Sequence, residues 1–391
     1  MRIGIDVRYL SHGLMGGVHR YITYLVPALI QAAPHHTFFL YADDKAPFEL
    51  QNLPANTSVR IMPYKNELSS IYLDLTMGRV MARDTVEVAH FPANYGFGPA
   101  DARTIITLHD EINILPLREI IRGHRKQFRS MAMMTYLHFC STSAVNRAHL
   151  LVTVSNYSKT KILQNSRIAP DRIVVTPSGP APTMQRVEDP AQREAVRTRH
   201  QLAKKFVLAD ALKNPGVLVK AWGLLPEMIR ETTQIVFFSR TPTPPAVVNE
   251  AEATGYARLL VRPSDEDLMA LYSMAEAFIF PSWIEGFGLP LLEAMTCGAP
   301  VIASDRGSIP EVAGDAALLS DADDAEALAR HIQQVLTSPA ETERLRALGY
   351  ARAAQFSWDK TAQKVLAAYE SARHLPDMIA AAKPMSPSRT L

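Results

Sequence analysis

The stretch 281-PSWIEGFGLPLLEAMTCGAPVI-302 decides the fold. An apolar run typical of a buried strand, Ala277–Pro281, leads into it, and a second such run, Ala299–Ser304, follows it. Between them, Glu285-Gly286-Phe287-Gly288 predicts a loop, because glycines give the backbone freedom and let a ligand approach the main chain closely. Together with the segment that follows the loop, the pattern predicts a strand, a glycine loop, a short helix and a second strand.

The short helix behind the glycine loop predicts a ligand site. Pro290 suits the first helical position and Gly298 suits the C-terminal cap. The start of a helix binds anions, since its free N–H groups and its dipole point at the ligand. Two carboxylates, Glu285 and Glu293, flank this anion site, and carboxylates accept hydrogen bonds from sugar hydroxyl groups. A surface helix with two solvated glutamates is the alternative, but it leaves the glycine loop without a reason.

With seven residues between them, Glu285 and Glu293 resemble the signature of the retaining glycosyltransferases of family 4. The resemblance implies an α/β protein of the GT-B fold, in which two Rossmann-like doubly wound domains face each other across a cleft. It implies a nucleotide-sugar co-substrate and no other cofactor. In the family pattern Glu285 contacts the reacting sugar and Glu293 holds the ribose. The donor-binding backbone between them is Gly286, Phe287, Gly288 and Leu289.

Composition agrees with a large globular enzyme. The chain has 391 residues, enough for two domains with full cores, and 47% of them are hydrophobic. The net charge of +2 gives no electrostatic case for a nucleic-acid partner. Cys140 and Cys297 are far apart and form no CxxC motif, which argues against a disulfide scaffold and fits a reducing compartment. The start, MRIGIDVRYL, has no signal-peptide pattern, so we expect a cytoplasmic protein.

Apolar runs with strand character recur along both halves of the chain. Because helical segments separate many of them, we expect mostly parallel, doubly wound sheets. The first half contains Ile3–Val7, His36–Tyr41, Val86–Phe91, Thr104–Leu108, Leu150–Val154 and Ile173–Thr176. The second half contains Phe206–Leu208, Gln234–Phe238, Arg258–Val261, Ala277–Phe280, Pro300–Ala303 and Ala316–Leu319.

The segment Pro177-Ser178-Gly179-Pro180 is the expected hinge between two domains. We expect an acceptor-side domain at 1–178 and a nucleotide-sugar-binding domain at 179–356. The resemblance implies that a C-terminal helix, 357–375, crosses back to the first domain. The proline- and serine-rich tail at 380–391 is predicted to be disordered.

Further candidate residues lie where strands end, the edge at which doubly wound sheets bind ligands. Gly16 and Gly17 follow the first strand, and the family places this loop near the donor diphosphate; a plain turn is the alternative. His109 and Asp110 follow the strand TIITL. The resemblance places His109 beside the donor sugar, whereas Asp110 either orients the histidine ring or meets the acceptor hydroxyl.

Lys213 matches a family lysine that contacts the donor diphosphate, but the loop before it departs from the pattern. Residues 209–212, ADAL, replace a longer loop with glycine and arginine, and the segment 239–241, SRT, replaces family glycines. Arg240 is a candidate for the missing positive charge or a surface residue. Arg262 matches a segment that contacts the nucleobase in the family.

We expect no metal site. Asp321-Ala322-Asp323 has the DxD form of metal-dependent glycosyltransferases, but it precedes a helical pattern and is better explained as the start of a helix. The stretch 118–129 is basic and amphipathic. Such a stretch is either a solvated helix face or a peripheral contact with an anionic membrane, here at its inner face.

These features predict a metal-independent, retaining hexosyltransferase. Its donor is GDP-mannose as first choice and UDP-glucose as second, and its acceptor is a glycan or a lipid-linked glycan. The predicted catalytic residues are Glu285, His109 and Lys213. Two alternatives stay open at this point: a GT-B nucleotide-sugar epimerase, and a catalytically degenerate subunit that binds nucleotides.

Overall fold

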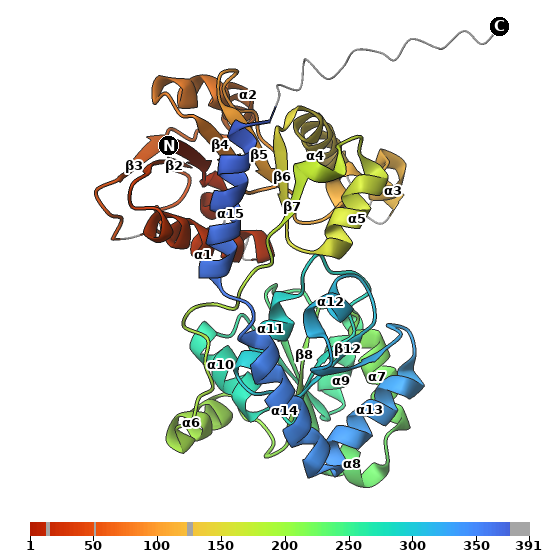
Figure 1. The fold of residues 1–391 in the computed structure, drawn as a ribbon. Helices are drawn as coiled ribbons and strands as arrows, with labels where there is room; N and C mark the ends of the chain where they lie inside the picture. Colours follow the sequence, from red (N-terminus) through yellow and green to blue (C-terminus); the bar gives the residue numbers. More distant parts are fainter. Residues whose placement is uncertain (13–15, 51, 123–127, 376–391) are drawn as a thin grey trace, which may run out of the picture. The chain divides into compact units, whose positions relative to one another are not determined.

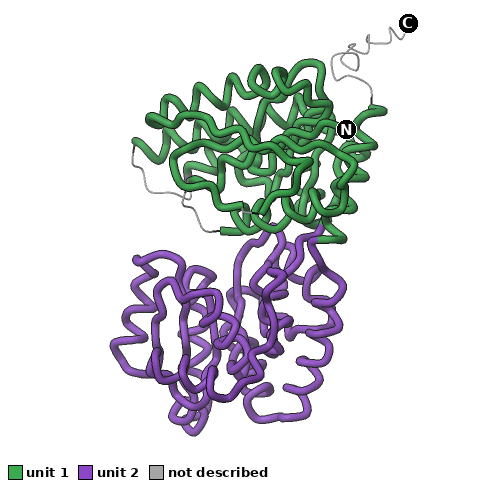
Figure 2. The backbone as a smooth tube through the Cα atoms, turned by 90° about the vertical axis from the view of Figure 1, so that its left-hand side faces the viewer, with its two compact units in different colours: residues 1–176, 359–391 green, residues 177–358 purple. Residues whose placement is uncertain are grey.

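The computed structural model describes residues 1–12, 16–50, 52–122 and 128–375. In these ranges the chain forms two compact units (Figure 1). Unit 1 consists of Met1–Thr176 together with the segment that begins at Asp359, and unit 2 is Pro177–Trp358 (Figure 2). The expected tail at 380–391 lies outside the described residues.

Unit 1 is built on a seven-stranded parallel sheet of order β3-β2-β1-β4-β5-β6-β7. The order reverses direction between β1 and β4, which makes this the switch point of the sheet. The strands are β1 (Arg2–Asp6), β2 (Thr37–Asp43), β3 (Thr57–Met62), β4 (Val88–Phe91), β5 (Arg103–Thr107), β6 (Leu150–Thr153) and β7 (Ile173–Val175).

The helices of unit 1 connect these strands. They are η1 (Arg8–His12), α1 (Gly17–Ala32), α2 (Glu67–Arg83), η2 (Ile112–Ile114), α3 (Leu117–Arg122), α4 (Phe128–Arg147), α5 (Asn156–Asn165) and η3 (Pro170–Arg172). The last helix, α15 (Trp358–Arg373), joins this unit over most of its length: Tyr369 lies 2.7 Å from His90 of β4, and Arg373 pairs with Glu87 at 3.7 Å.

Unit 2 has a six-stranded parallel sheet of order β10-β9-β8-β11-β12-β13, with its switch point between β8 and β11. The strands are β8 (Phe206–Asp210), β9 (Gln234–Ser239), β10 (Ala257–Val261), β11 (Ala277–Phe280), β12 (Val301–Ser304) and β13 (Ala317–Ser320). The helices are α6 (Pro190–His200), α7 (Pro215–Leu224), α8 (Glu227–Thr232), α9 (Ala246–Ala253), α10 (Asp265–Met274), α11 (Leu289–Thr296), α12 (Ile309–Ala313), α13 (Ala325–Thr337) and α14 (Pro339–Ala353).

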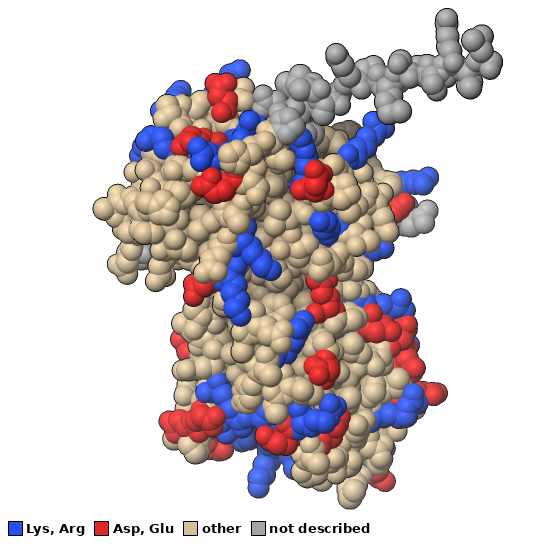
Figure 3. All heavy atoms as spheres, viewed as in Figure 1, with Lys and Arg blue, Asp and Glu red and all other residues tan. Residues whose placement is uncertain are grey.

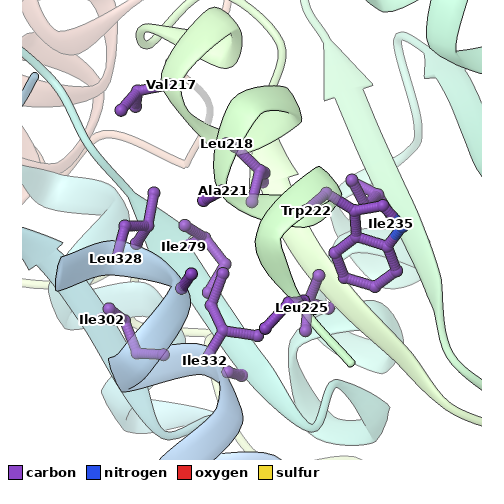
Figure 4. Packing of buried hydrophobic residues seen from close by; sticks show 14 of the residues in the cluster. Val217, Leu218, Ala221, Trp222, Leu225, Ile235, Ile279, Ile302, Leu328 and Ile332 are labelled. Atoms are coloured by element: carbon purple, nitrogen blue, oxygen red, sulfur yellow. The ribbon is translucent and has the colours of Figure 1, made fainter. Parts of the chain in front are cut away.

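Buried strands of unit 2 carry apolar residues on both faces. Ile279 and Ile302 belong to one cluster with Trp222 of α7 and Ile332 of α13 (Figure 4). Neighbouring strand residues point to opposite faces, so Phe278 packs on the other side, with its ring 5.2 Å from that of Tyr272 in α10. Continuous apolar strands of this kind are typical of parallel sheets covered on both faces.

The α/β class with two parallel sheets is confirmed. The strand pattern missed β3, Thr57–Met62, because only its last residue is buried and its Ile61 is 59% exposed. An edge strand with a polar surface lacks the apolar run that identifies the central strands. None of the described helices is long and apolar enough to cross a membrane.

Candidate functional site

The switch point of unit 2 places two sequence motifs side by side. Strand β8 runs into the segment that ends at Asn214, where α7 begins, and β11 runs into the glycine loop before α11. The two strands pair directly, with Ile279 opposite Ala209. In parallel sheets, ligands bind in the crevice that forms where neighbouring connections leave toward opposite faces.

Lys213 and Glu285 form an ion pair in this crevice. The Lys213 Nζ atom lies 2.6 Å from the Glu285 Oε1 atom, and the two side chains are 33% and 13% exposed. The hydroxyl group of Ser282 donates a second hydrogen bond to the same carboxylate oxygen, at 2.8 Å. The structure therefore brings together two of the residues predicted from the sequence and holds the carboxylate in one orientation.

The segment between β12 and α12 holds the Glu285 loop through hydrogen bonds. The sequence analysis did not identify this segment. The backbone N–H and the hydroxyl group of Ser308 donate to the carbonyl oxygen of Glu285, at 3.2 and 3.0 Å. Gly307 has a φ of +63°, and a Cβ atom there would lie 2.8 Å from both the N and the O atoms of Glu285. Only glycine fits this position without a shift of the loop.

Helix α11 begins directly after the glycine loop. Gly288 is its N-terminal cap with a φ of +96°, which explains why glycine occupies this position. Because the helix spans Leu289–Thr296, Glu293 is its fifth residue, at mid-helix. Glu293 is 1% exposed. A carboxylate at this depth is consistent with a fixed contact to a bound ligand, and its role stays a prediction.

The altered loop before Lys213 contains a buried carboxylate. Asp210 is 4% exposed, and its Oδ1 atom accepts a hydrogen bond from the N–H of Leu212 at 2.9 Å. Burial raises the pKa of Asp210, the neighbouring charge of Glu285 raises it further, and the Leu212 N–H, Arg240 and Lys213 oppose this rise. The two cations and the two carboxylates therefore interact at one edge of the sheet.

Arg262 supports the loop that carries Arg240. Its Nε atom donates to the carbonyl oxygen of Arg240 at 3.2 Å, and its own N–H donates to Ser239 at 2.7 Å. The residue is exposed and has a φ of +52°, a rare backbone conformation for a residue other than glycine. Its proposed contact with a nucleobase remains a prediction.

The DxD segment is occupied by protein contacts. Asp321 pairs with Arg306 and accepts the N–H of Asp323 at 2.9 Å. Asp323 accepts a hydrogen bond from the indole of Trp283 at 2.8 Å. The cap of helix α13 is the following residue, Asp324, whose side chain accepts the N–H of Ala327. These contacts tie the segment to the glycine loop and to the start of α13.

In unit 1, His109 lies just beyond the end of β5. Its Nε2 atom is 2.9 Å from the carbonyl oxygen of Pro92, its N–H donates to Asn94 Oδ1 at 3.0 Å, and its ring packs edge-on against Tyr21 at 4.8 Å. A carbonyl oxygen only accepts hydrogen bonds, so Nε2 carries the proton and Nδ1 is the acceptor. Burial lowers the pKa of His109 to about 4, against the opposing effect of the Pro92 carbonyl group.

A row of hydrogen-bonded, buried side chains ends at Tyr21, the residue whose ring packs against His109. His90 lies 2.7 Å from the Tyr369 hydroxyl group and 2.8 Å from Thr107 Oγ1 through its two ring nitrogens. Thr107 in turn lies 3.4 Å from the hydroxyl group of Tyr21, the ring that contacts His109. Burial, and to a smaller extent the charge of His109, lower the pKa of His90 to about 3. The imidazole ring of His90 is therefore neutral in this hydrogen-bonded row.

The structure describes the other three candidates of unit 1, Gly16, Gly17 and Asp110, but their local contacts do not point to a ligand. Gly16 is the N-terminal cap of α1 in an extended conformation, and a Cβ atom on Gly16 or Gly17 would meet nothing within 4 Å. Their predicted contact with a diphosphate therefore has no steric support within unit 1. Asp110 Oδ1 accepts the N–H of Ile112 at 3.0 Å, which fixes the turn after His109.

Comparison with known protein families gives two matches that cover most of the chain. Residues 15–180 match the model described as Glycosyltransferase Family 4, and residues 207–352 match the model described as Glycosyl transferases group 1. The O-antigen chain mannosyltransferase B of Escherichia coli is 33% identical over 297 residues, which are 74% of this chain and 75% of that protein. The Escherichia coli serotype-specific mannosyltransferase WbdA is 30% identical over 68% of this chain, but the match spans only 33% of that longer protein.

Solved structures show the same fold at low identity. Sucrose-phosphate synthase from Thermosynechococcus elongatus superposes with a TM-score of 0.71 at 19% identity, covering 98% of this chain and 100% of that chain. Anabaena Alr3699/HepE, solved in complex with UDP-glucose, superposes with a TM-score of 0.67 at 15% identity, covering 95% of this chain and 100% of that chain.

Proposed function

The chain belongs to the family 4 glycosyltransferases, retaining hexosyltransferases with the GT-B fold, and we propose that it transfers mannose from GDP-mannose to a hydroxyl group of a glycan or lipid-linked glycan. The observation that carries the proposal is the ion pair of Lys213 and Glu285 at the switch point of unit 2. In this pair Lys213 is a cation that can bind a phosphate group, and Glu285 beside it is a carboxylate that can accept hydrogen bonds from sugar hydroxyl groups. The choice of mannose is supported by the names of the two Escherichia coli relatives.

The proposed reaction breaks the bond between the sugar C1 atom and the diphosphate and forms a bond from C1 to the acceptor oxygen on the same face. Negative charge develops on the leaving diphosphate, and preorganised cations and N–H groups stabilise such charge. In this proposal Lys213, Arg240 and the start of α11 provide them. Glu285 holds the reacting sugar, fixed by Ser282 as described above.

Neutral His109 belongs to the sugar-binding part of the proposal. With its Nε2 proton directed at Pro92, its Nδ1 atom accepts a hydrogen bond from a sugar hydroxyl group. Glu293 holds the ribose, and Gly16 and Gly17 let the diphosphate approach the backbone closely. Asp110 has a weaker assignment, to the acceptor.

We propose that the reaction needs no divalent metal. The support is the engagement of the DxD carboxylates, because Asp321 pairs with Arg306 and Asp323 binds Trp283. Turnover is therefore expected to survive excess EDTA. Abolition of turnover by EDTA, with rescue by manganese, contradicts this part of the proposal.

We also propose peripheral contact with an anionic membrane through the basic stretch 118–129. Residues 123–127, with Arg125 and Lys126, lie outside the described residues. Phe128 at the start of α4 is 89% exposed. The next residue, Arg129, faces Glu67 of α2 at 3.9 Å, and both of these side chains are exposed. Three exposed apolar residues lie on one face of α2: Leu68, Tyr72 and Leu75.

Vesicle sedimentation tests this contact. Binding to vesicles with anionic lipid, and loss of binding when Phe128 and Tyr72 are changed to serine, is the expected result. Equal recovery with neutral and anionic vesicles refutes it. Nucleic acid is not a proposed partner, because Lys and Arg residues are interspersed with Asp and Glu residues on the face seen in Figure 3.

A donor screen tests the main proposal. The chain is incubated with GDP-mannose, UDP-glucose and other common nucleotide sugars, with and without mannose-containing acceptors, and products are identified by mass spectrometry. We expect hydrolysis of GDP-mannose without acceptor and transfer with it. The control is Glu285→Gln, which keeps the shape of the loop. Free sugar epimer from donor alone indicates an epimerase instead, and nucleotide binding without turnover indicates a degenerate subunit.

A further inference from the structure

One buried carboxylate in unit 1 has no place in the site described so far. Glu111 directly follows His109 and Asp110, and it is 4% exposed. Its Oε2 atom is buried and has no hydrogen-bond partner among the residues that the structure describes. Burying a carboxylate oxygen without a hydrogen-bond partner is unfavourable, so native proteins rarely retain one without a reason.

The backbone around Glu111 is rigid. The Thr153 hydroxyl group donates to the carbonyl oxygen of Leu108 at 2.7 Å, and the Ser158 hydroxyl group donates to that of His109 at 3.1 Å. The carbonyl oxygen of Glu111 itself accepts the N–H of Ile114 at 2.9 Å. Because these hydrogen bonds fix the loop on both sides of Glu111, the backbone holds this side chain in a defined position.

Glu111 lies at the ligand edge of the sheet. Strands β5 and β6 are direct neighbours, so the loop after β5 and the start of α5 after β6 share the carboxyl edge. Tyr157, in the first turn of α5, is half-buried, and burial followed by the charge of Glu111 raises its pKa. The carboxylate therefore lies close to Tyr157 and one residue beyond the His109-Asp110 pair.

We propose that Glu111 binds the acceptor, with its Oε2 atom accepting a hydrogen bond from a sugar hydroxyl group. The inference rests on the proposed function, because it assigns a residue to the acceptor of that reaction. A sugar hydroxyl group satisfies a carboxylate oxygen by donating to it without introducing a charge. A carboxylate that is unsatisfied until the acceptor arrives also favours acceptor binding, since binding removes the cost of the unpaired oxygen.

Two substitutions separate this role from a structural one. Glu111→Gln keeps the size of the side chain, and Glu111→Leu removes its polar atoms. The matched control is Glu231→Gln in α8, where the side chain is exposed. For each protein we measure KM for a mannose-containing acceptor, the rate of donor hydrolysis without acceptor, and Tm.

We expect Glu111→Gln to raise acceptor KM about 10-fold and Glu111→Leu to raise it further, toward about 100-fold, the range for a lost hydrogen bond to a charged group. Donor hydrolysis stays within about twofold of wild type. Tm of Glu111→Leu rises by about 2–4 °C, because a buried oxygen atom without a hydrogen-bond partner has been removed. The control changes none of the three quantities.

Two results overturn the inference. Unchanged acceptor KM in both variants shows that Glu111 is structural, and a parallel loss of donor hydrolysis and transfer shows that it supports His109 instead. If the wild-type chain turns over no donor, the proposed function has failed separately. Binding to a glycan array then decides: weaker binding by Glu111→Gln than by Glu231→Gln supports the inference, and equal binding or no binding by wild type refutes it.

Discussion

Replacing Gly307 with alanine tests whether the segment between β12 and α12 sets the position of Glu285. The new Cβ atom would lie 2.8 Å from the backbone N and O atoms of Glu285, whereas ordinary contacts begin at 3.4 Å. The Glu285 loop must therefore move by about 0.6 Å. A displacement of about 1 Å in a catalytic group costs about 100-fold in rate, so we expect a fall in kcat of about 10-fold.

Stability is affected as well, and a matched control separates the two effects. Alanine in the left-handed region costs about 1–2 kcal/mol wherever it occurs. Gly255, which follows α9, also has a positive φ, +88°, but a Cβ atom there would meet nothing within 4 Å. Gly255→Ala therefore also places a Cβ atom on a backbone with positive φ, but without the collision. We expect it to lower Tm and to leave kcat unchanged.

The assay is steady-state transfer at saturating donor and acceptor, with urea denaturation of the same samples. Temperature is kept well below both Tm values, so that unfolding does not contribute to the difference in rate. Equal kcat values for Gly307→Ala and Gly255→Ala refute the reasoning, because a forced shift of the Glu285 backbone then has no effect on the reaction.

The remaining predictions concern the two glutamates, the lysine and the buried histidine. Glu285→Gln is expected to lower kcat about 100-fold, while Glu293→Gln weakens donor binding by about 1–3 kcal/mol, measured by titration calorimetry; similar donor affinity and kcat in both variants and wild type contradict the assignment. Lys213→Ala is expected to weaken binding of nucleoside diphosphate more than binding of the nucleoside, and equal losses for both ligands show that the lysine does not face phosphate. His90, with its pKa lowered from 6.5 to about 3, stays neutral in the folded chain while the unfolded chain takes up a proton below pH 6.5. Stability is therefore lost as pH falls from 6.5 toward 3, and urea denaturation across this range is expected to show a smaller loss for His90→Gln.

The sequence predicted best which charged residues lie together when those residues directly follow buried strands. Lys213 and Glu285 follow strands β8 and β11, whose paired residues Ala209 and Ile279 are 70 positions apart in the sequence, yet a parallel sheet makes those strands neighbours. Because apolar runs identify the strands and the doubly wound order places their carboxyl ends together, the two residues were expected at one edge.

Residues that act through backbone contacts were not predictable in the same way. Gly307 and Ser308 form part of an ordinary turn signal in the sequence, and only the structure shows that they hold the Glu285 loop. Glu111 was missed for a different reason: an acidic residue after a strand is normally solvated, and its burial depends on how α5 packs against the loop.

The altered loop of unit 2 shows how a buried carboxylate is retained beside the proposed phosphate site. Asp210 closes the turn after β8, since its side chain accepts the Leu212 N–H and its carbonyl oxygen accepts the Lys213 N–H at 3.1 Å. That turn carries the Nζ atom of Lys213 to within 2.6 Å of the Glu285 carboxylate, so these two charges are partners. A buried charge that loses its only partner is costly. The donor that we propose replaces both partners at once: phosphate takes the place of Glu285 at the lysine, and sugar hydroxyl groups take the place of the lysine at Glu285. We therefore expect the proposed site to select a ligand that carries both groups, and a phosphate or a sugar alone is expected to bind weakly because it leaves one partner uncompensated.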